Sequence, residues 1–140
     1  MQYYPGDAYV DWWASSIFQA DAITDLQSLN FLMDAEEHKK PVMLVENTPY
    51  TLFVQNEATW EAWFEPFFNM IKSHPVIKGV YYSNIPWTAW PQWSHWGDAR
   101  IEAACPKIFD NYINIMNDKI WLNGGAKETL LEALYGAKGL

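Results

Sequence analysis

The chain has one cysteine, few basic residues and no long apolar run. Cys105 stands alone, so the sequence offers no disulfide within the chain and no cysteine-based metal site. Its 9 Lys and Arg residues against 17 Asp and Glu residues give a formal net charge of −8, and a nucleic acid is therefore not an expected partner. No apolar run reaches the about 18 residues of a membrane-spanning helix. Residues 1–7 lack the pattern of a signal peptide.

Apolar and aromatic residues are, in contrast, abundant. Hydrophobic residues make up 50% of the chain and aromatic residues 17%, with nine tryptophans, a composition that is typical of a folded domain and excludes disorder. The 140 residues suit one domain spanning residues 1–140. Because no histidine pair at metal spacing and no glycine-rich phosphate loop occurs, neither a metal nor another cofactor is expected.

Strand-like and helix-like segments alternate along the chain. Residues 10–18 predict a strand, residues 25–38 a helix, and a second strand ends at Glu46. A helix over residues 59–74 and a strand over residues 76–82 follow, then a helix from Pro106 and a short one over residues 128–135 after Asn123-Gly124-Gly125. Three strand–helix units in series predict an α/β fold with parallel strands and right-handed crossovers.

The spacing of apolar residues predicts which side of each helix faces the core. The first helix carries its stripe on Leu26, Leu29, Leu32 and Met33. The second has Trp60, Trp63, Phe64, Phe67, Phe68 and Ile71 at steps of three and four, with Pro66 either kinking it or starting its main part. The third is expected to face inward with Ile108, Phe109, Tyr112, Ile113 and Met116.

The second predicted strand ends in an acid. Residues 41–45 are apolar and are bounded by lysines and by Pro49, a pattern that is typical of a buried strand. Glu46 follows at the carboxyl end, where a barrel of eight βα units presents its catalytic groups. The alternative is an acid that merely begins a solvated loop.

A tryptophan-rich loop after the third predicted strand is the second candidate. Trp87, Trp90, Trp93 and Trp96 recur at three-residue spacing. Flat indole faces suit sugar rings, and the indole N–H can bond a hydroxyl group, whereas the alternative is that these aromatic residues are simply buried. Tyr82 and Asn84, at the end of the strand, are candidate polar contacts for a substrate.

Several short motifs occur together in a fixed order. They are Tyr4-Pro5-Gly6-Asp7 before Val10-Asp11-Trp12-Trp13, Lys40-Pro41-Val42-Met43 closing on Glu46, Trp60-x-x-Trp63-Phe64, Ile77-Lys78-Gly79 leading to Tyr82-Ser83-Asn84 and Trp87, and Trp96-Gly97-Asp98-x-Arg100-Ile101. In this order and spacing the chain resembles the clan A glycoside hydrolases, specifically the family 26 β-mannanases and related endoglycanases. The resemblance covers roughly residues 3–116.

This resemblance implies a partial (β/α)8 TIM barrel whose three parallel βα units correspond to units six to eight. The chain would then be the carboxyl-terminal portion of such a domain. Three units cannot close a barrel of about 250 residues. The missing N-terminal barrel half, or self-association of the chain, is therefore the expected partner, together with a polysaccharide or oligosaccharide substrate.

The resemblance also implies roles for single residues. Glu46 would be the nucleophile of a retaining hydrolysis of a β-linked polysaccharide of the mannan, glucan or xylan type. Trp87 would form the floor for the sugar at the cleavage point, with Trp90 and Trp96 as further substrate contacts. Phe18, a further candidate substrate contact, takes the place at which many of these barrels have a tyrosine that bonds the nucleophile.

The acid/base partner of Glu46 would come from unit four, which has no counterpart here, so the isolated chain is expected to be catalytically incomplete. Of the other acids, Asp7 and Asp11 are expected at the opposite end of the sheet. Asp98 is expected either to form an ion pair with Arg100 or to cap a helix, and Glu57 is a remote substitute.

The leading hypothesis is therefore an enzyme, a glycoside hydrolase, and its family relatives imply an extracellular or periplasmic location. The first alternative is a non-catalytic carbohydrate-binding or degenerate glycosidase-like module. The second is an interaction domain whose aromatic residues form an interface.

Overall fold

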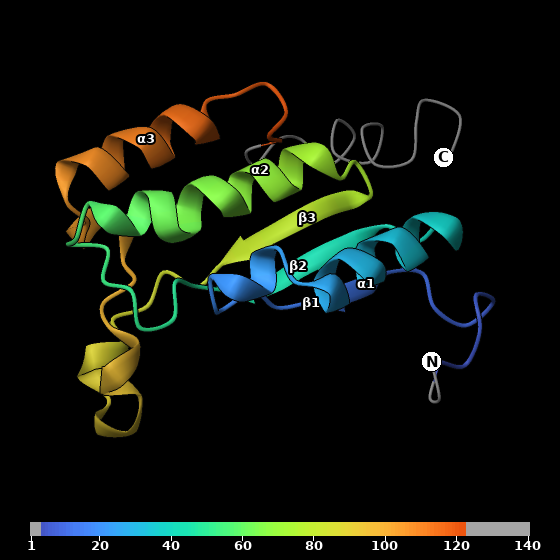
Figure 1. Cartoon of the computed structure of the whole chain (residues 1–140), viewed down its shortest axis with the longest axis horizontal. Coiled ribbons are helices and arrows are strands. Elements are labelled where there is room, and N and C mark those ends of the chain that lie inside the picture. Colours follow the sequence, from blue (N-terminus) through green and yellow to red (C-terminus); the bar gives the residue numbers. More distant parts are fainter. Residues whose placement is uncertain (1–3, 123–140) are drawn as a thin grey trace.

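The computed structural model describes residues 4–122, which form a three-stranded parallel sheet with helices packed on it (Figure 1). The strands are β1 (Trp13–Ser15), β2 (Val42–Asn47) and β3 (Ile77–Tyr82), in the order β1-β2-β3. Trp13 pairs with Val42, which in turn pairs with Ile77. The predicted α/β class with parallel strands is thereby confirmed, whereas its assignment to units six to eight of a barrel stays a prediction.

Three helices and several short helical turns connect the strands. The turn η1 (Asp21–Ile23) and helix α1 (Leu26–Glu37) join β1 to β2, and the π-helical turn η2 (Trp60–Phe64) runs directly into α2 (Glu65–Ser73) before β3. The turns η3 (Trp87–Ala89), η4 (Pro91–Trp96) and η5 (Ile101–Ala103) lie between β3 and α3 (Pro106–Met116). Within residues 4–122, no helix has both the length and the apolar character needed to cross a membrane.

Local sequence signals explain where these helices begin. The Asp25 carboxylate accepts a hydrogen bond from the Ser28 backbone N–H at 2.7 Å and so caps α1. Pro66 lies in the first turn of α2 and Pro106 in that of α3, where a missing N–H leaves no hydrogen bond unmade. Pro66 therefore starts the main part of the predicted 59–74 helix, as one of its two interpretations required.

The helices cover one face of the sheet and leave the other open. Trp13, Val42, Leu44 and Ile77 are buried, and they share a single hydrophobic cluster with residues of all three helices. Ala14 and Met43, which alternate with these residues along the strands, are exposed. Because α1, α2 and α3 all contribute to one cluster, no helix within residues 4–122 covers the opposite face of the sheet.

The inward side of α2 is as predicted, but those of α1 and α3 are narrower than predicted. All six apolar residues predicted along η2 and α2 are buried. On α1, Leu32 and Ala35 are buried, whereas Leu26 and Met33 are 78% and 63% exposed. On α3, Ile108 is buried, whereas Phe109 and Ile113 are each 41% exposed.

The reason lies in helix geometry. Met33 follows the buried Leu32 directly and Phe109 follows the buried Ile108, so each side chain is rotated by about 100° from the line that contacts the sheet. Leu26 stands in the first turn of α1. The predicted strand over residues 10–18 is also shorter, since β1 is an edge strand that pairs on one side only. The helix predicted over residues 128–135 lies outside the described residues.

The segment before β1 is fastened at the amino end of the sheet. The Tyr4 hydroxyl donates to the Asp7 carboxylate at 2.5 Å, the His38 ring Nδ1 lies 3.0 Å from it, and the Lys40 ammonium donates to the Asp7 carbonyl. Two hydrogen bonds lower the pKa of the Asp7 carboxyl, and the one from Tyr4 has a larger effect than the one from His38. Asp7 therefore lies where the sequence placed it, away from Glu46, and His38 contacts it.

Removal of the α1 cap tests this account of the fold. We expect Asp25→Ala to lower the free energy of unfolding by about 1 kcal/mol, because the first turn loses its side-chain acceptor. Asp34→Ala, an exposed acid of the same helix that caps nothing, is the matched control and should change stability by less than about 0.5 kcal/mol. Urea unfolding followed by circular dichroism measures both, and equal losses would contradict the capping role.

Candidate functional site

Buried and exposed residues alternate along β2, and this alternation shifts by one residue at Glu46. Val42 and Leu44 face the core, so strict alternation would place residue 46 there as well. Instead Glu46 is exposed and Asn47 is fully buried. Glu46 has φ +55°, and two residues of β2 face one residue of β3 between the pairs Leu44–Val80 and Asn47–Tyr82. This β-bulge turns the acid out of the core at the carboxyl edge of the sheet.

Asn47 connects β2 to β3 and to the segment that follows β1. Its side-chain oxygen accepts a hydrogen bond from the Ile17 N–H at 2.9 Å, and its side-chain nitrogen donates to the Tyr81 carbonyl at 2.8 Å. The Asn47 carbonyl also accepts from the Ser83 N–H at 2.8 Å. Sequence reasoning missed this residue, although a polar residue directly after an apolar strand and before Pro49 was a signal for it.

Aromatic side chains from three segments meet beside this edge. The Trp96 ring centre lies 5.3 Å from that of Phe18, 5.0 Å from that of Tyr50 and 5.1 Å from that of Trp87. Together these side chains form what we call the aromatic cluster: Phe18, Tyr50, Trp87, Trp90, Trp93, His95 and Trp96. Phe18 follows β1, Tyr50 follows β2 and the rest follow β3, so the cluster depends on the parallel sheet. Tyr50 was not predicted.

A cavity of about 350 Å³ opens beside the aromatic cluster, between three of its rings and the segment after β1. It is lined by Ser16, Phe18, Gln19, Ala22, Tyr50 and Trp96. A pocket of this size, with apolar walls and a few polar groups, suits a small ligand or one ring of a larger one. The structure thus brings together Phe18, Trp87, Trp90 and Trp96 of the predicted binding residues.

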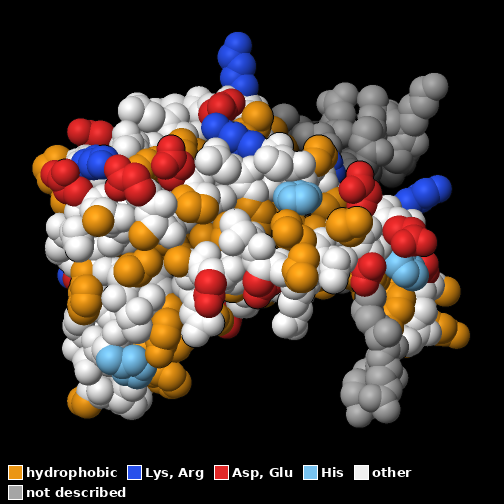
Figure 2. All heavy atoms as spheres, in the orientation of Figure 1, with side chains coloured by type: hydrophobic (Ala, Val, Ile, Leu, Met, Phe, Trp, Pro, Cys, Tyr) orange, Lys and Arg blue, Asp and Glu red, His pale blue; other side chains and the backbone are white. Residues whose placement is uncertain are grey.

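The loop that carries the tryptophans forms a projecting lobe. It extends from the carboxyl end of the sheet (yellow, lower left in Figure 1), and the side chains visible there in Figure 2 include no Asp, Glu, Lys or Arg. Residues 83–97 indeed contain none of these four types. Trp90 and Trp93, each 44% exposed, present an aromatic surface on this lobe.

Trp87 holds a hydrogen-bond donor without a partner. Its Nε1 is buried, and no described residue accepts a hydrogen bond from it. A buried donor without an acceptor costs about 1–3 kcal/mol. An oxygen atom of a ligand would supply that acceptor.

Tyr82 and Asn84 are not brought to this site. The Tyr82 hydroxyl donates to the Ala99 carbonyl at 2.6 Å, its ring packs against those of Trp63, Phe64 and Tyr112, and burial raises the pKa of its hydroxyl. Asn84 accepts from the Ile101 N–H and donates to the Glu102 carboxylate. Both side chains hold the base of the lobe through these hydrogen bonds. They therefore have a structural role, whereas a substrate contact was expected.

The remaining acids also have structural places. The Arg100 guanidinium bonds the Asp98 carboxylate at 2.6 Å, which confirms the predicted ion pair and lowers the pKa of Asp98. Glu57 is an exposed residue of the turn before η2. Within residues 4–122, no group of three or more His, Cys, Asp or Glu side chains is placed to hold a metal ion.

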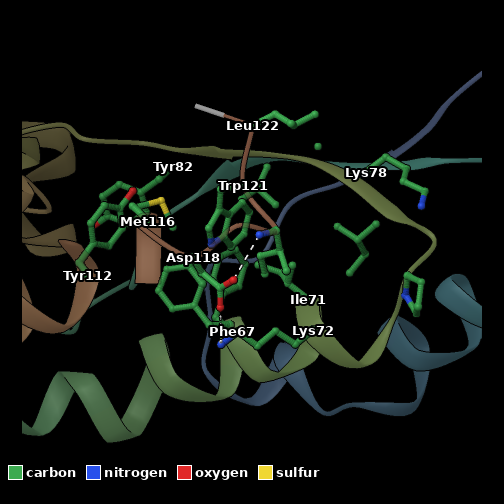
Figure 3. A pocket seen from close by; sticks show the side chains of 16 residues that line it. Phe67, Ile71, Lys72, Lys78, Tyr82, Tyr112, Met116, Asp118, Trp121 and Leu122 are labelled. Carbon is green, nitrogen blue, oxygen red and sulfur yellow. Dashed lines mark hydrogen bonds and ion pairs between the residues drawn. The ribbon is translucent and has the colours of Figure 1, made fainter. Parts of the chain in front are cut away.

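A larger cavity, of about 890 Å³, lies elsewhere (Figure 3). It is lined by α2, by Ile77 to Val80 in β3, and by α3 with the segment after it, including Tyr112 and Trp121. The Lys72 ammonium and the Asp118 carboxylate face each other there at 4.0 Å (Figure 3). This cavity lies along β3 from its amino-terminal residue Ile77, and of the candidate residues only Tyr82 lines it. We therefore assign the site to the cavity of about 350 Å³ beside the aromatic cluster.

The chain matches no protein-family model and no curated protein. The family resemblance of its motifs therefore stays a prediction. The function is inferred below from the arrangement of Glu46 and the aromatic cluster.

Gly97, at the end of the lobe, offers a test of how the cluster is held. It has φ +90°, and a Cβ there would lie 3.0 Å from the Phe53 ring, so we expect Gly97→Ala to lower the free energy of unfolding by about 1–3 kcal/mol. Gly6→Ala is the control for backbone strain alone, because Gly6 has φ +107° but no atom within 4 Å of its Cβ. Urea unfolding and the near-ultraviolet dichroism of the tryptophans measure both; an unchanged tryptophan spectrum in Gly97→Ala would contradict this role.

Proposed function

We propose that the chain is the carboxyl-terminal part of a retaining glycoside hydrolase that acts on a β-linked polysaccharide. The observation that carries this proposal is the bulge that presents Glu46 at the carboxyl edge of the sheet, the edge that also carries the aromatic cluster. In such a reaction a carboxylate attacks the anomeric carbon and forms a covalent glycosyl-enzyme, while the glycosidic bond breaks and an acid protonates the departing oxygen; water, deprotonated by the same residue, then hydrolyses the intermediate. Glu46 is the nucleophile in this proposal.

The aromatic cluster supports a sugar as the ligand. Sugar C–H groups pack on indole faces, and the Trp87 Nε1 needs an acceptor such as a hydroxyl oxygen. The lobe carries no acidic or basic residue, which favours a neutral polysaccharide over a charged one. Phe18 and Trp96 line the cavity in which one sugar ring would lie.

The open sheet supports a partner that completes the barrel. The helix-free face exposes Met43 and Tyr81, which are 39% and 57% exposed, and the outer edges of β1 and β3 pair with no other strand of the described part. Exposed edges and apolar faces of this kind promote association. The partner would be the N-terminal barrel half or a second copy of the chain, and it would supply the acid/base about 5–5.5 Å from Glu46. An extracellular or periplasmic location goes with this proposal.

A non-catalytic carbohydrate-binding module is the second candidate. One observation favours it: Phe18 stands beside Trp96, where its ring can stack on a sugar but cannot donate a hydrogen bond to a carboxylate. A module of this kind would keep the aromatic cluster and the cavity while Glu46 served no chemical step. The two candidates differ in what they require of Glu46.

Binding measurements test the sugar site that both candidates share. We expect Trp96→Ala to weaken binding of a β-linked manno- or xylo-oligosaccharide by about two- to tenfold, because stacking on one aromatic face contributes about 0.5–1.5 kcal/mol and the cavity loses a wall. Trp121→Ala, a tryptophan of the other cavity, is the matched control and should leave the affinity unchanged. Calorimetric titration measures both, and equal affinities of Trp96→Ala and the native chain would contradict the site.

Covalent trapping separates the enzyme from the binding module. The chain is mixed with a polypeptide that carries the first five βα units of a related barrel, and a mechanism-based glycosidase inhibitor that traps the nucleophile is added. Mass spectrometry is expected to find the label on Glu46 and none on Glu46→Gln. If no reconstitution gives a label while oligosaccharide binding persists, the binding module holds and the hydrolase does not.

A further inference from the structure

Asn47 uses both ends of its carboxamide in a place where no water reaches it. The residue is 0% exposed, and its oxygen and nitrogen bond the Ile17 N–H on one side and the Tyr81 carbonyl on the other. Ile17 follows β1 and Tyr81 belongs to β3, so the carboxamide connects the chain on both sides of β2. Few side chains could replace it, because the same group must accept on one side and donate on the other.

This arrangement constrains the backbone of the residue before it. In a regular strand that buries Val42 and Leu44, residue 47 would be exposed. The Asn47 side chain can be buried only if the backbone rotates at residue 46. Glu46 takes up that rotation with φ +55°, a conformation that residues with a Cβ rarely adopt. The buried hydrogen bonds of Asn47 outweigh the local cost at Glu46, since leaving either group unpaired would be more unfavourable.

We propose that Asn47 is the positioning residue of Glu46: its carboxamide holds the bulge and so turns the Glu46 carboxylate outward. The catalytic meaning of this role rests on the proposed function, whereas the structural coupling of the two residues does not. In the absence of the carboxamide bonds, β2 would continue with regular alternation. Residue 46 would then point into the core, where the carboxylate would meet the apolar cluster of Val42 and Leu44.

A double-mutant cycle on the full chain measures the coupling. Glu46→Gly should raise the melting temperature by about 3 °C in the native background, because glycine adopts φ +55° without steric cost. In the Asn47→Leu background, which removes both hydrogen bonds and keeps the number of side-chain heavy atoms, residue 46 is extended and the same Glu46→Gly change should lower the melting temperature by about 3 °C. The sign of the glycine effect, unlike stability as such, reports the backbone at residue 46.

Thr59→Val is the matched background control. Thr59 is also a buried polar residue, 1% exposed, and its hydroxyl donates to the Phe53 carbonyl at 2.8 Å. In this background Glu46→Gly should still raise the melting temperature. If Glu46→Gly raises it equally in the Asn47→Leu background, the proposal is overturned.

Two further measurements keep the proposal open to refutation if Asn47→Leu does not fold. Asn47→Asp keeps the acceptor for the Ile17 N–H but loses the donor to the Tyr81 carbonyl, so the gain from Glu46→Gly should shrink; an undiminished gain counts against the proposal. The NMR coupling between the amide and α protons of residue 46 should shift toward its extended value in the same variant, and an unchanged coupling also counts against it.

The trapping reaction then connects the coupling to the chemistry. In the reconstituted enzyme, Asn47→Asp should slow labelling of Glu46 at least about tenfold while oligosaccharide affinity stays within about twofold, as expected for a residue that orients the nucleophile and does not bind the sugar. Absence of labelling in the native chain would overturn the proposed function; a reversed glycine effect would still support the positioning role. Unaltered labelling in Asn47→Asp would overturn the positioning role alone.

Discussion

The carboxyl edge of the sheet depends on two hydrogen bonds of the buried Asn47 side chain, one to the segment after β1 and one to β3. β1 ends at Ser15, and from Ile17 onward the chain is held to β2 by the Asn47 carboxamide and by the backbone bonds Thr48 N–H to Ile17 carbonyl and Tyr50 N–H to Phe18 carbonyl. These bonds place Phe18 and Tyr50 side by side and within reach of Trp96. The cavity between these rings follows from how β1 and β2 are joined beyond their regular pairing.

The tryptophan lobe is anchored by the same core that carries the sheet. Tyr82 reaches from β3 to the Ala99 carbonyl, Asn84 bonds the Ile101 N–H, and Pro86 pairs with Asp98 in an isolated antiparallel bridge. Side chains that looked like substrate contacts thus close the base of the lobe. A loop closed at its base loses little further freedom when a ligand binds, which is a common property of binding sites on rigid scaffolds.

Much of the fold was predictable because its signals are local. The helical spacing of Trp60 through Ile71, the prolines at the first turns of α2 and α3 and the apolar run of β2 each predicted an element that the structure confirms. Phe18, Trp87 and Trp96 were named as site residues from the family resemblance and the tryptophan spacing, and the structure brings their rings together. The shift of the alternation at Glu46 was not predictable, because it arises from bonds between Asn47 and residues 30 and 34 positions away along the chain. The predicted core-facing sides of α1 and α3 were too wide for the same reason. The spacing of apolar residues predicts a stripe along a helix, but packing against the sheet decides how many of those residues are buried.

The uneven distribution of charge along the chain has a consequence for the conditions under which the lobe can act. The net charge of −8 belongs to the rest of the molecule, and between Ser83 and Gly97 the only ionisable side chain is that of His95. Contacts made by indole faces and by neutral hydrogen-bond donors are not screened by dissolved ions, whereas contacts between exposed charges are. The contacts that the proposed sugar site would make are therefore of the kind that dissolved salt does not screen.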